Sequence, residues 1–189
     1  LAAQAVGALA AYEPEPGLKF DRIYEVYSQR FKREDLEDED APEGAHFDPK
    51  ILPEEYLTQP GSQHAFVYVC TIQRMRINLF GKPEGVSWGD RDDESDAAIL
   101  DIPIHAFDVI VADECHRGYT ASEESKWREV LNHFDGIRIG LTATPAAHTT
   151  AFFGNPVYEY GIQRAVADGY LADHDAVKIS SEITMRGHF

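Results

Sequence analysis

Short apolar runs alternate with amphipathic stretches along this 189-residue chain. Residues 65–70 (A-F-V-Y-V-C), 109–112 (V-I-V-A) and 137–141 (I-R-I-G-L) are rich in β-branched and aromatic residues, a composition that predicts strands. Uninterrupted apolar runs are typical of strands that are buried on both faces of a sheet. Helical spacing of apolar residues predicts helices ending near Phe80 and covering 125–134. This rhythm of strand, helix and strand predicts an α/β fold with a parallel sheet and right-handed crossovers.

The two ends of the chain carry further elements. The apolar, Ala-rich pattern of residues 1–12 predicts a helix. This helix is expected to end at the sequence E-P-E-P-G, residues 13–17. Residues 20–28 alternate loosely between polar and apolar side chains and are rich in β-formers, so another strand is expected there. Toward the C-terminus the pattern predicts a helix over 162–168 and a strand over 176–179.

Two polar stretches interrupt this pattern, at 31–63 and 81–98. The first contains four prolines and an acidic run, and the second is rich in Gly, Asp and Ser. Long segments of this kind between regular elements are usually functional or disordered, and we interpret both as loops or insertions. The apolar pairs Ile51-Leu52 and Tyr56-Leu57 are expected to anchor the first of them to the body of the domain.

The composition is that of an ordinary globular domain, with 43% hydrophobic and 26% charged residues. Two cysteines provide no disulfide framework, so a cytoplasmic protein is expected. No apolar run approaches the roughly 18 residues that a spanning helix needs, so no membrane partner is expected. The first residue is Leu and no basic segment precedes the apolar start, so we expect a cut end rather than a signal peptide.

The formal net charge of −16 is concentrated in two places. Residues 34–40 carry −6 and residues 90–96 carry −4, which leaves −6 for the rest of the chain. Runs of like charge are usually solvated loops. Contacts to nucleic-acid phosphates require Lys and Arg, and the sequence shows no basic footprint. This balance counts against strong DNA binding by this chain alone.

Two of the predicted strands end in short polar clusters. The run 109–112 is followed by Asp113 and Glu114, and the run 137–141 by Thr142, Ala143 and Thr144. Ligands of open α/β sheets collect at the carboxyl ends of the strands, so these clusters predict one active-site edge. Hydrolysis of a nucleoside triphosphate needs a carboxylate for Mg²⁺ and a group that activates water. Asp113 suits the first role and Glu114 the second.

Two other interpretations of the acidic cluster stay open. An acidic pair after a strand often does no more than begin a surface loop, because Asp favours turns. Asp113, Cys115 and His116 are also residue types that bind zinc. Structural zinc sites normally use paired Cys or His at short spacing, and the other cysteine, Cys70, has no such partner.

The strings D-E-C-H at 113–116 and L-T-A-T-P at 141–145 resemble the Walker B box and a later motif of superfamily 2 DExH helicases and translocases. The string T-I-Q at 71–73 and the pattern Y-x-Y-G-I-Q-R-A-V-A-D-G-Y-L at 158–171 are similar to the motor (restriction) subunit of type I restriction-modification enzymes. The resemblance covers nearly all of the chain. It implies a RecA-like P-loop NTPase fold.

Domain boundaries and residue roles follow from this resemblance. Residues 1–170 would be a partial first RecA-like domain, and 171–189 the beginning of a connection toward a second one. The resemblance implies that Asp113 binds Mg²⁺ through water and that Glu114 activates water. It further implies that His116 couples the nucleotide site to the rest of the motor. The residues that would link hydrolysis to movement on nucleic acid are Thr142 and Thr144.

Three polar residues match nucleic-acid contacts of the family: Gln4, Thr71 and Gln73. Gln4 follows the pattern L-x-x-Q, and it could equally be an ordinary exposed residue. Thr71 could equally be a helix cap. The remaining histidines show no metal-ligand spacing and are treated as ordinary surface or loop residues; they are His46, His64, His105, His133, His148, His174 and His188.

A P-loop of the form G-x-x-x-x-G-K-[ST] is not found in the sequence, and Gly81-Lys82 is followed by Pro83, which has no N–H to donate. The parent protein is expected to be an ATP- and Mg²⁺-dependent DNA translocase, working with methyltransferase and specificity subunits. The isolated chain is expected to be inactive. Two alternatives are another DExH helicase acting on DNA or RNA, and a non-catalytic helicase-like interaction module.

Overall fold

The computed structural model describes residues 2–30, 50–61, 65–82, 97–116 and 121–173. The chain divides into two compact units, residues 1–153 and 154–189. The expected strand at 176–179 lies outside the described residues. The division of the chain into a motor domain up to residue 170 and a connection after it stays a prediction.

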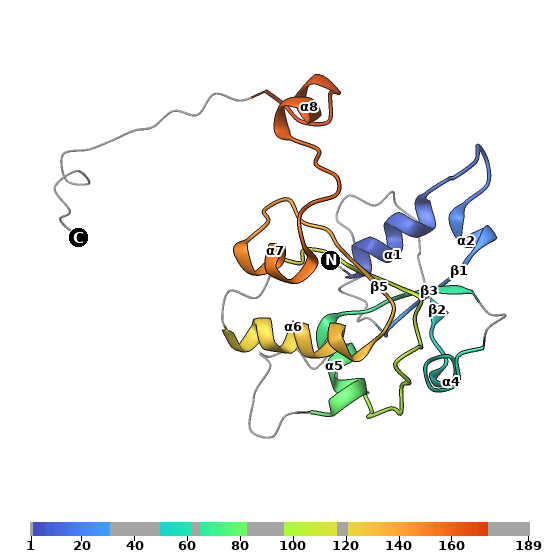
Figure 1. Ribbon diagram of the computed structural model, residues 1–189. Coiled ribbons are helices and arrows are strands. Elements are labelled where there is room, and N and C mark those ends of the chain that lie inside the picture. The colour runs from blue at the N-terminus through green and yellow to red at the C-terminus, as the bar shows by residue number, and fades with distance from the viewer. Residues whose placement is uncertain (1, 31–49, 62–64, 83–96, 117–120, 174–189) are drawn as a thin grey trace, which may run out of the picture. The chain divides into compact units, whose positions relative to one another are not determined.

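The first unit contains two parallel sheets (Figure 1). One has the order β2 (Lys50–Ile51), β1 (Glu25–Ser28), β3 (Phe66–Val69), and the other pairs β4 (Val109–Ala112) with β5 (Ile137–Gly140). Parallel pairing throughout the described strands confirms the predicted α/β class. Within the described residues the strands form two separate sheets, since β3 and β4 are not hydrogen-bonded neighbours. Side chains join the two sheets instead, because Phe107, just before β4, stacks on Tyr68 of β3 at 6.5 Å between ring centroids.

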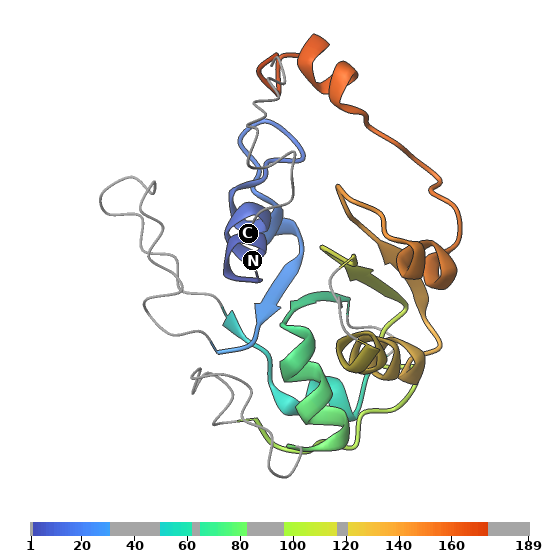
Figure 2. The same ribbon diagram turned by 90° about the vertical axis from the view of Figure 1, so that its left-hand side faces the viewer.

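Helices connect the strands. The helices of the described residues are α1 (Ala2–Ala11), α2 (Phe20–Ile23), α4 (Glu54–Thr58), α5 (Ile72–Phe80), α6 (Ala121–His133), α7 (Ala147–Phe153) and α8 (Ile162–Ala167). The predicted helices at α1, α5, α6 and α8 are confirmed. Figure 2 shows α5 and α6 side by side, and the ion pair between Arg76 and Glu129 joins them at 3.0 Å. None of the described helices is long and apolar enough to cross a membrane.

The strand expected over 20–28 is wrong in its first half. Residues Phe20–Ile23 form one helical turn, which the hydrogen bond from the Tyr24 N–H to the Phe20 carbonyl closes at 2.9 Å. Asp21 lies in this first turn, where a negative charge favours a helix start. The strand begins only at Glu25, and its Val26, Tyr27 and Ser28 are buried.

The main core lies between the three-stranded sheet and helices α5 and α6. It consists of Tyr27, Leu52, Leu57, Met75, Ile102, Ala106, Val130 and Phe134. The expected anchors Leu52 and Leu57 are therefore confirmed, with 8% and 3% of their surfaces exposed. Ile51 is 51% exposed, so the prediction that it anchors the loop is wrong.

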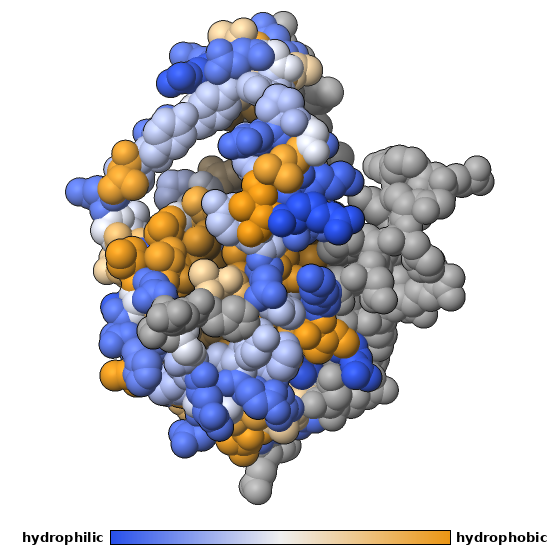
Figure 3. Space-filling view, turned by 90° about the vertical axis from the view of Figure 1, so that its right-hand side faces the viewer, coloured by the Kyte–Doolittle hydropathy of each residue, from blue (hydrophilic) through white to orange (hydrophobic). Residues whose placement is uncertain are grey.

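One face of the β4–β5 sheet is bare. Val109 pairs with Ile137 and Val111 with Ile139, so these four side chains lie on the same face, and all are exposed by 42% or more. The opposite face is covered, because Ala112 packs with Leu131 of α6 and with the phenylalanines of α7. The expectation that both strands are buried on both faces is thus wrong. Figure 3 shows apolar side chains gathered in the middle of one face of the molecule.

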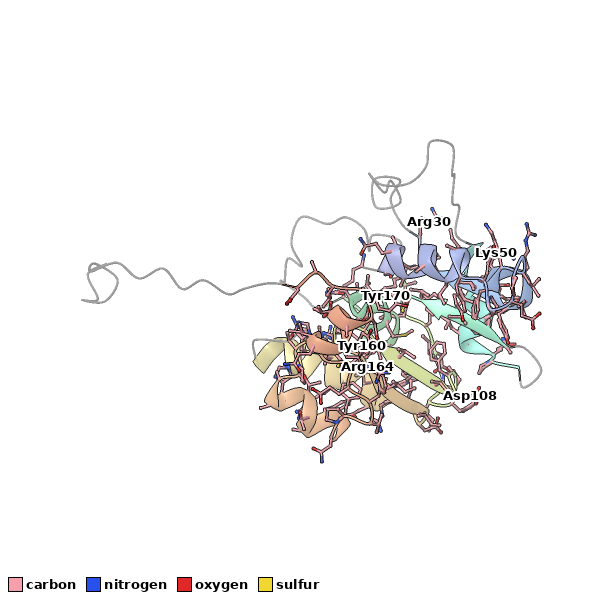
Figure 4. All side chains as sticks on the ribbon, turned by 90° about the horizontal axis from the view of Figure 1, so that it is seen from above. Arg30, Lys50, Asp108, Tyr160, Arg164 and Tyr170 are labelled. Atoms are coloured by element: carbon pink, nitrogen blue, oxygen red, sulfur yellow. The ribbon has the colours of Figure 1, made fainter. Side chains whose placement is uncertain are left out.

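The second unit carries α8 and several exposed aromatic side chains. The Tyr160 hydroxyl donates to Asp168 Oδ2 at 2.7 Å, and this hydrogen bond raises the pKa of the Tyr160 phenol. The Arg164 guanidinium lies 5.6 Å from the centroid of the Tyr160 ring, and Figure 4 labels both residues. Tyr160, Arg164 and Asp168 therefore fix the start of α8 against its end.

Replacing either of two glycines of the first unit with alanine is expected to change the free energy of unfolding, in opposite directions for the two positions. A Cβ on Gly136 would collide with the carbonyl oxygen of Phe107, which is backbone and cannot turn away. A Cβ on Gly7, within α1, meets nothing within 4 Å. Overpacking costs about 1–3 kcal/mol or more, whereas an open helical Gly→Ala change gains roughly 0.5–1 kcal/mol. Urea unfolding of Gly136→Ala and Gly7→Ala measures both changes, and equal midpoints would contradict the close approach of Gly136 to the Phe107 carbonyl.

Candidate functional site

The carboxyl ends of β4 and β5 meet at one edge. Ala112 is level with Gly140 in the register of the two strands. The pairing continues past both strands, because the Leu141 N–H donates to the Ala112 carbonyl at 2.9 Å and the Cys115 N–H to the Leu141 carbonyl at 3.0 Å. The D-E-C-H and T-A-T segments therefore leave the sheet side by side.

The D-E-C-H segment forms a tight turn whose second residue is strained. Glu114 has φ 51°, in the left-handed region that side chains other than glycine rarely adopt. The Glu114 N–H donates to Asp113 Oδ1 at 2.9 Å, which holds the turn locally. A residue in this conformation costs on the order of 1–3 kcal/mol and persists only where its surroundings fix it.

The turn brings Glu114 and His116 together and joins them to the neighbouring strand end. Glu114 Oε2 lies 3.2 Å from His116 Nδ1, and the same nitrogen lies 2.8 Å from Thr142 Oγ1. Thr142 Oγ1 also accepts from the Thr144 N–H at 3.0 Å. One network of contacts thus includes all five of the predicted catalytic and coupling residues, starting from Asp113.

The side chains of the network differ in solvent exposure, and the two carboxylates are accessible enough to meet a hydrated metal ion and a reacting water. Asp113 is exposed, the Glu114 side chain is 33% exposed and that of His116 only 15%. Mg²⁺ keeps several of its waters and takes few protein ligands, so one accessible carboxylate is sufficient for it. Asp113 fits that requirement, and Glu114 beside it can reach a water. The P-loop amides and lysine that hold nucleotide phosphates are not part of this sequence, so these residues fit only the metal and water half of the site.

The geometry argues against the zinc interpretation. Cys115 is buried, and its Sγ lies beside Gly140, where an added Cβ would approach it to 2.9 Å. Burial raises the pKa of the Cys115 thiol, and the charges of Asp113 and Glu114 raise it further. Zinc binds the thiolate, which this environment disfavours. Among the described residues, no three His, Cys, Asp or Glu side chains are placed to hold a metal ion together.

The predicted nucleic-acid contacts lie on two helices. Gln4 is exposed on α1, and Gln73 is exposed in the first turn of α5. Thr71 caps α5, since its Oγ1 accepts from the Arg74 N–H at 3.1 Å. The Thr71 N–H donates to Gln29 Oε1 at 2.7 Å, so the capping alternative describes its observed contacts. Contact of these residues with nucleic acid stays a prediction.

One further residue, His148, contacts the network and is not predicted from the sequence. His148, interpreted from the sequence as an ordinary loop residue, lies on α7, and its Nε2 is 3.0 Å from the His116 carbonyl oxygen. Its only sequence signal is its position three residues after the L-T-A-T-P string. Helix α7 itself was also not predicted.

Parallel strands followed by D-E-C-H and T-A-T at one edge define the class: this is an incomplete RecA-like α/β domain of the superfamily 2 DExH helicase type. Residues 1–147 match the family described as "Type III restriction enzyme, res subunit", and the chain belongs to that family.

Known relatives agree with this class. Over 100 residues, half of this chain, it is 41% identical to the type I restriction enzyme EcoAI endonuclease subunit of Escherichia coli. Over 89 residues, 39% of this chain, it is 44% identical to the EcoKI endonuclease subunit of Escherichia coli strain K12. A probable helicase of African swine fever virus is 32% identical over 82 residues, which are 40% of this chain and 10% of the viral protein.

The chain spans only 12% and 8% of the lengths of the two restriction-enzyme relatives. No solved structure matches it.

Proposed function

We propose that this chain is part of the ATP-dependent motor of a type I restriction enzyme, which couples ATP hydrolysis to movement along duplex DNA. The observation that carries the proposal is the joined edge of β4 and β5, where His116 Nδ1 contacts both Glu114 and Thr142. The two restriction-enzyme relatives and the viral helicase support a helicase-like motor.

Each residue of the edge has a distinct role in this proposal. Asp113 holds Mg²⁺ through a water, and Glu114 orients and deprotonates the attacking water. Bound ATP would supply the phosphoryl group, and bound Mg²⁺ would neutralise the negative charge that develops on it. Since Glu114 shares His116 Nδ1 with Thr142, a change at the carboxylate alters the contacts of the segment that follows β5. This shared contact is the proposed physical basis for coupling ATP hydrolysis to movement on DNA. Thr144 takes part through its N–H, which donates to Thr142 Oγ1.

The complete natural polypeptide that contains this chain is proposed to work in the cytoplasm. Its proposed partners are DNA and the methyltransferase and specificity subunits of a restriction-modification complex. The sequence shown here has no phosphate cradle, so we expect no turnover from these 189 residues alone. ATP hydrolysis by the isolated chain would overturn that expectation.

Movement on duplex DNA is the activity to test in the complete polypeptide with its partner subunits. We expect ATP-dependent displacement of a third strand from a triplex placed downstream on duplex DNA, without separation of the two duplex strands. Separation of the duplex strands would favour the alternative, another DExH helicase. Failure to bind Mg²⁺-nucleotide would favour a non-catalytic interaction module, and both results would contradict the translocase proposal.

A further inference from the structure

The carbonyl of His116 is held from outside the D-E-C-H turn. His148, 32 positions further along the chain, places its Nε2 3.0 Å from that oxygen. A carbonyl oxygen can only accept a hydrogen bond, so Nε2 of His148 must carry the proton. The interaction therefore fixes His148 as a donor to the backbone of the turn.

Helix α7, which carries His148, is packed onto the β4–β5 sheet and α6. Helix α7 begins with hydrogen bonds from the Thr149 and Thr150 N–H groups to the Ala146 carbonyl, at 3.0 and 3.1 Å. At its other end, Phe152 and Phe153 pack against the cluster of Ala112, Cys115 and Leu131. His148 and these phenylalanines line, together with Cys115 and Leu131, a small cavity of about 20 Å³. Groups on packed elements keep their geometry better than groups on loops.

His116 thereby connects three segments. Its ring contacts Glu114 within the turn and Thr142 after β5, and its carbonyl accepts from His148 on α7. Glu114, two residues earlier, has the strained φ of 51°. Such strain persists only where several contacts over-determine the backbone, and the bond from His148 is one that lies outside the turn.

We infer that His148 is a positioning residue: its hydrogen bond to the His116 carbonyl holds Glu114 where it can activate water. The inference rests on the proposed ATP hydrolysis and adds a residue outside the D-E-C-H and T-A-T strings to that site. His148 does not touch the reacting atoms, and its effect passes through the backbone of the turn. Loss of the bond lets the turn relax and moves the Glu114 carboxylate.

The test compares His148→Ala, His148→Gln and His105→Ala in the complete polypeptide. Gln carries a side-chain N–H that can reach the same carbonyl, and Ala does not. His105 is exposed in the segment before β4, so it serves as the matched control. Because a displacement of about 1 Å can cost roughly 100-fold in rate, we expect His148→Ala to lower kcat for ATP at least about 10-fold. KM should stay within about twofold, and His148→Gln and His105→Ala should retain the wild-type kcat.

A purely structural role gives a different pattern. If His148 only anchored α7, the Tm would fall while kcat per folded molecule stayed the same, and this result would overturn the inference. Equal losses in the Ala and Gln variants would overturn it as well. A second readout does not depend on hydrolysis: in structures of the same proteins, Glu114 should keep its positive φ in His148→Gln and lose it in His148→Ala. A wild-type protein without ATP hydrolysis would contradict the proposed function, and the φ of Glu114 would then decide the role of His148.

Discussion

Replacing Glu114 with Gln should lower the DNA-stimulated rate of ATP hydrolysis by at least about 100-fold, the usual contribution of a general base. The substitution keeps the size of the side chain, and the amide oxygen can still accept from His116 Nδ1, which lies 3.2 Å from the carboxylate in the native chain. The loss is therefore expected in kcat, with the affinity for ATP and the Tm preserved. Steady-state phosphate release measures it.

Glu129→Gln is the matched control. Glu129 is an exposed carboxylate on α6 that pairs with Arg76, and exposed pairs contribute about 0–1 kcal/mol. This variant should hydrolyse ATP at the wild-type rate. Equal activity in the Glu114 and Glu129 variants would show that Glu114 does not activate water. The acidic pair would then be only the beginning of a surface loop.

Truncating Phe134 to Ala should lower the free energy of unfolding by about 3–5 kcal/mol, the usual cost of removing a buried phenyl ring. Phe134 is 3% exposed and makes edge-on contacts with the rings of Phe107 and His133, at 5.2 and 4.8 Å between centroids. It joins α6 to the segment before β4, so its loss should destabilise the strand that carries the acidic turn. Urea unfolding followed by circular dichroism measures the change.

Ile137→Ala provides the comparison, because Ile137 lies on the bare face of the β4–β5 sheet and is 66% exposed. Its truncation should change the free energy of unfolding by no more than about 0.5 kcal/mol. A cost close to that of Phe134→Ala would mean that the face is covered in solution.

The edge of the site was predictable from the sequence, because the apolar runs identify the two strands and their order along the chain shows how they are connected. The runs before Asp113 and Thr142 are short and rich in β-branched residues, and one helix separates them. Two parallel strands connected in this way end at the same edge, which brings the two polar clusters together. The start of α5 was likewise predictable, since a Thr such as Thr71 before an apolar periodic stretch is a common helix cap.

Other features were not predictable, for physical reasons. The run Val109–Ala112 is apolar throughout, so its pattern cannot show that the face with Val109 and Val111 is bare here. The role of His148 leaves no pattern because its partner is a backbone carbonyl, a group that every residue has. The helical turn at Phe20–Ile23 forms against the local β propensity and is held by backbone hydrogen bonds, among them that from the Phe20 N–H to the Tyr12 carbonyl, a partner that the local pattern does not show.

Phosphate release from ATP by the complete natural polypeptide, measured with and without duplex DNA in the presence of Mg²⁺, tests the central claim most directly. If the edge that joins Asp113 and Glu114 to Thr142 drives a DNA motor, hydrolysis should depend on Mg²⁺ and rise strongly when duplex DNA is added. Mg²⁺-independent hydrolysis, or no hydrolysis with DNA present, would contradict the account.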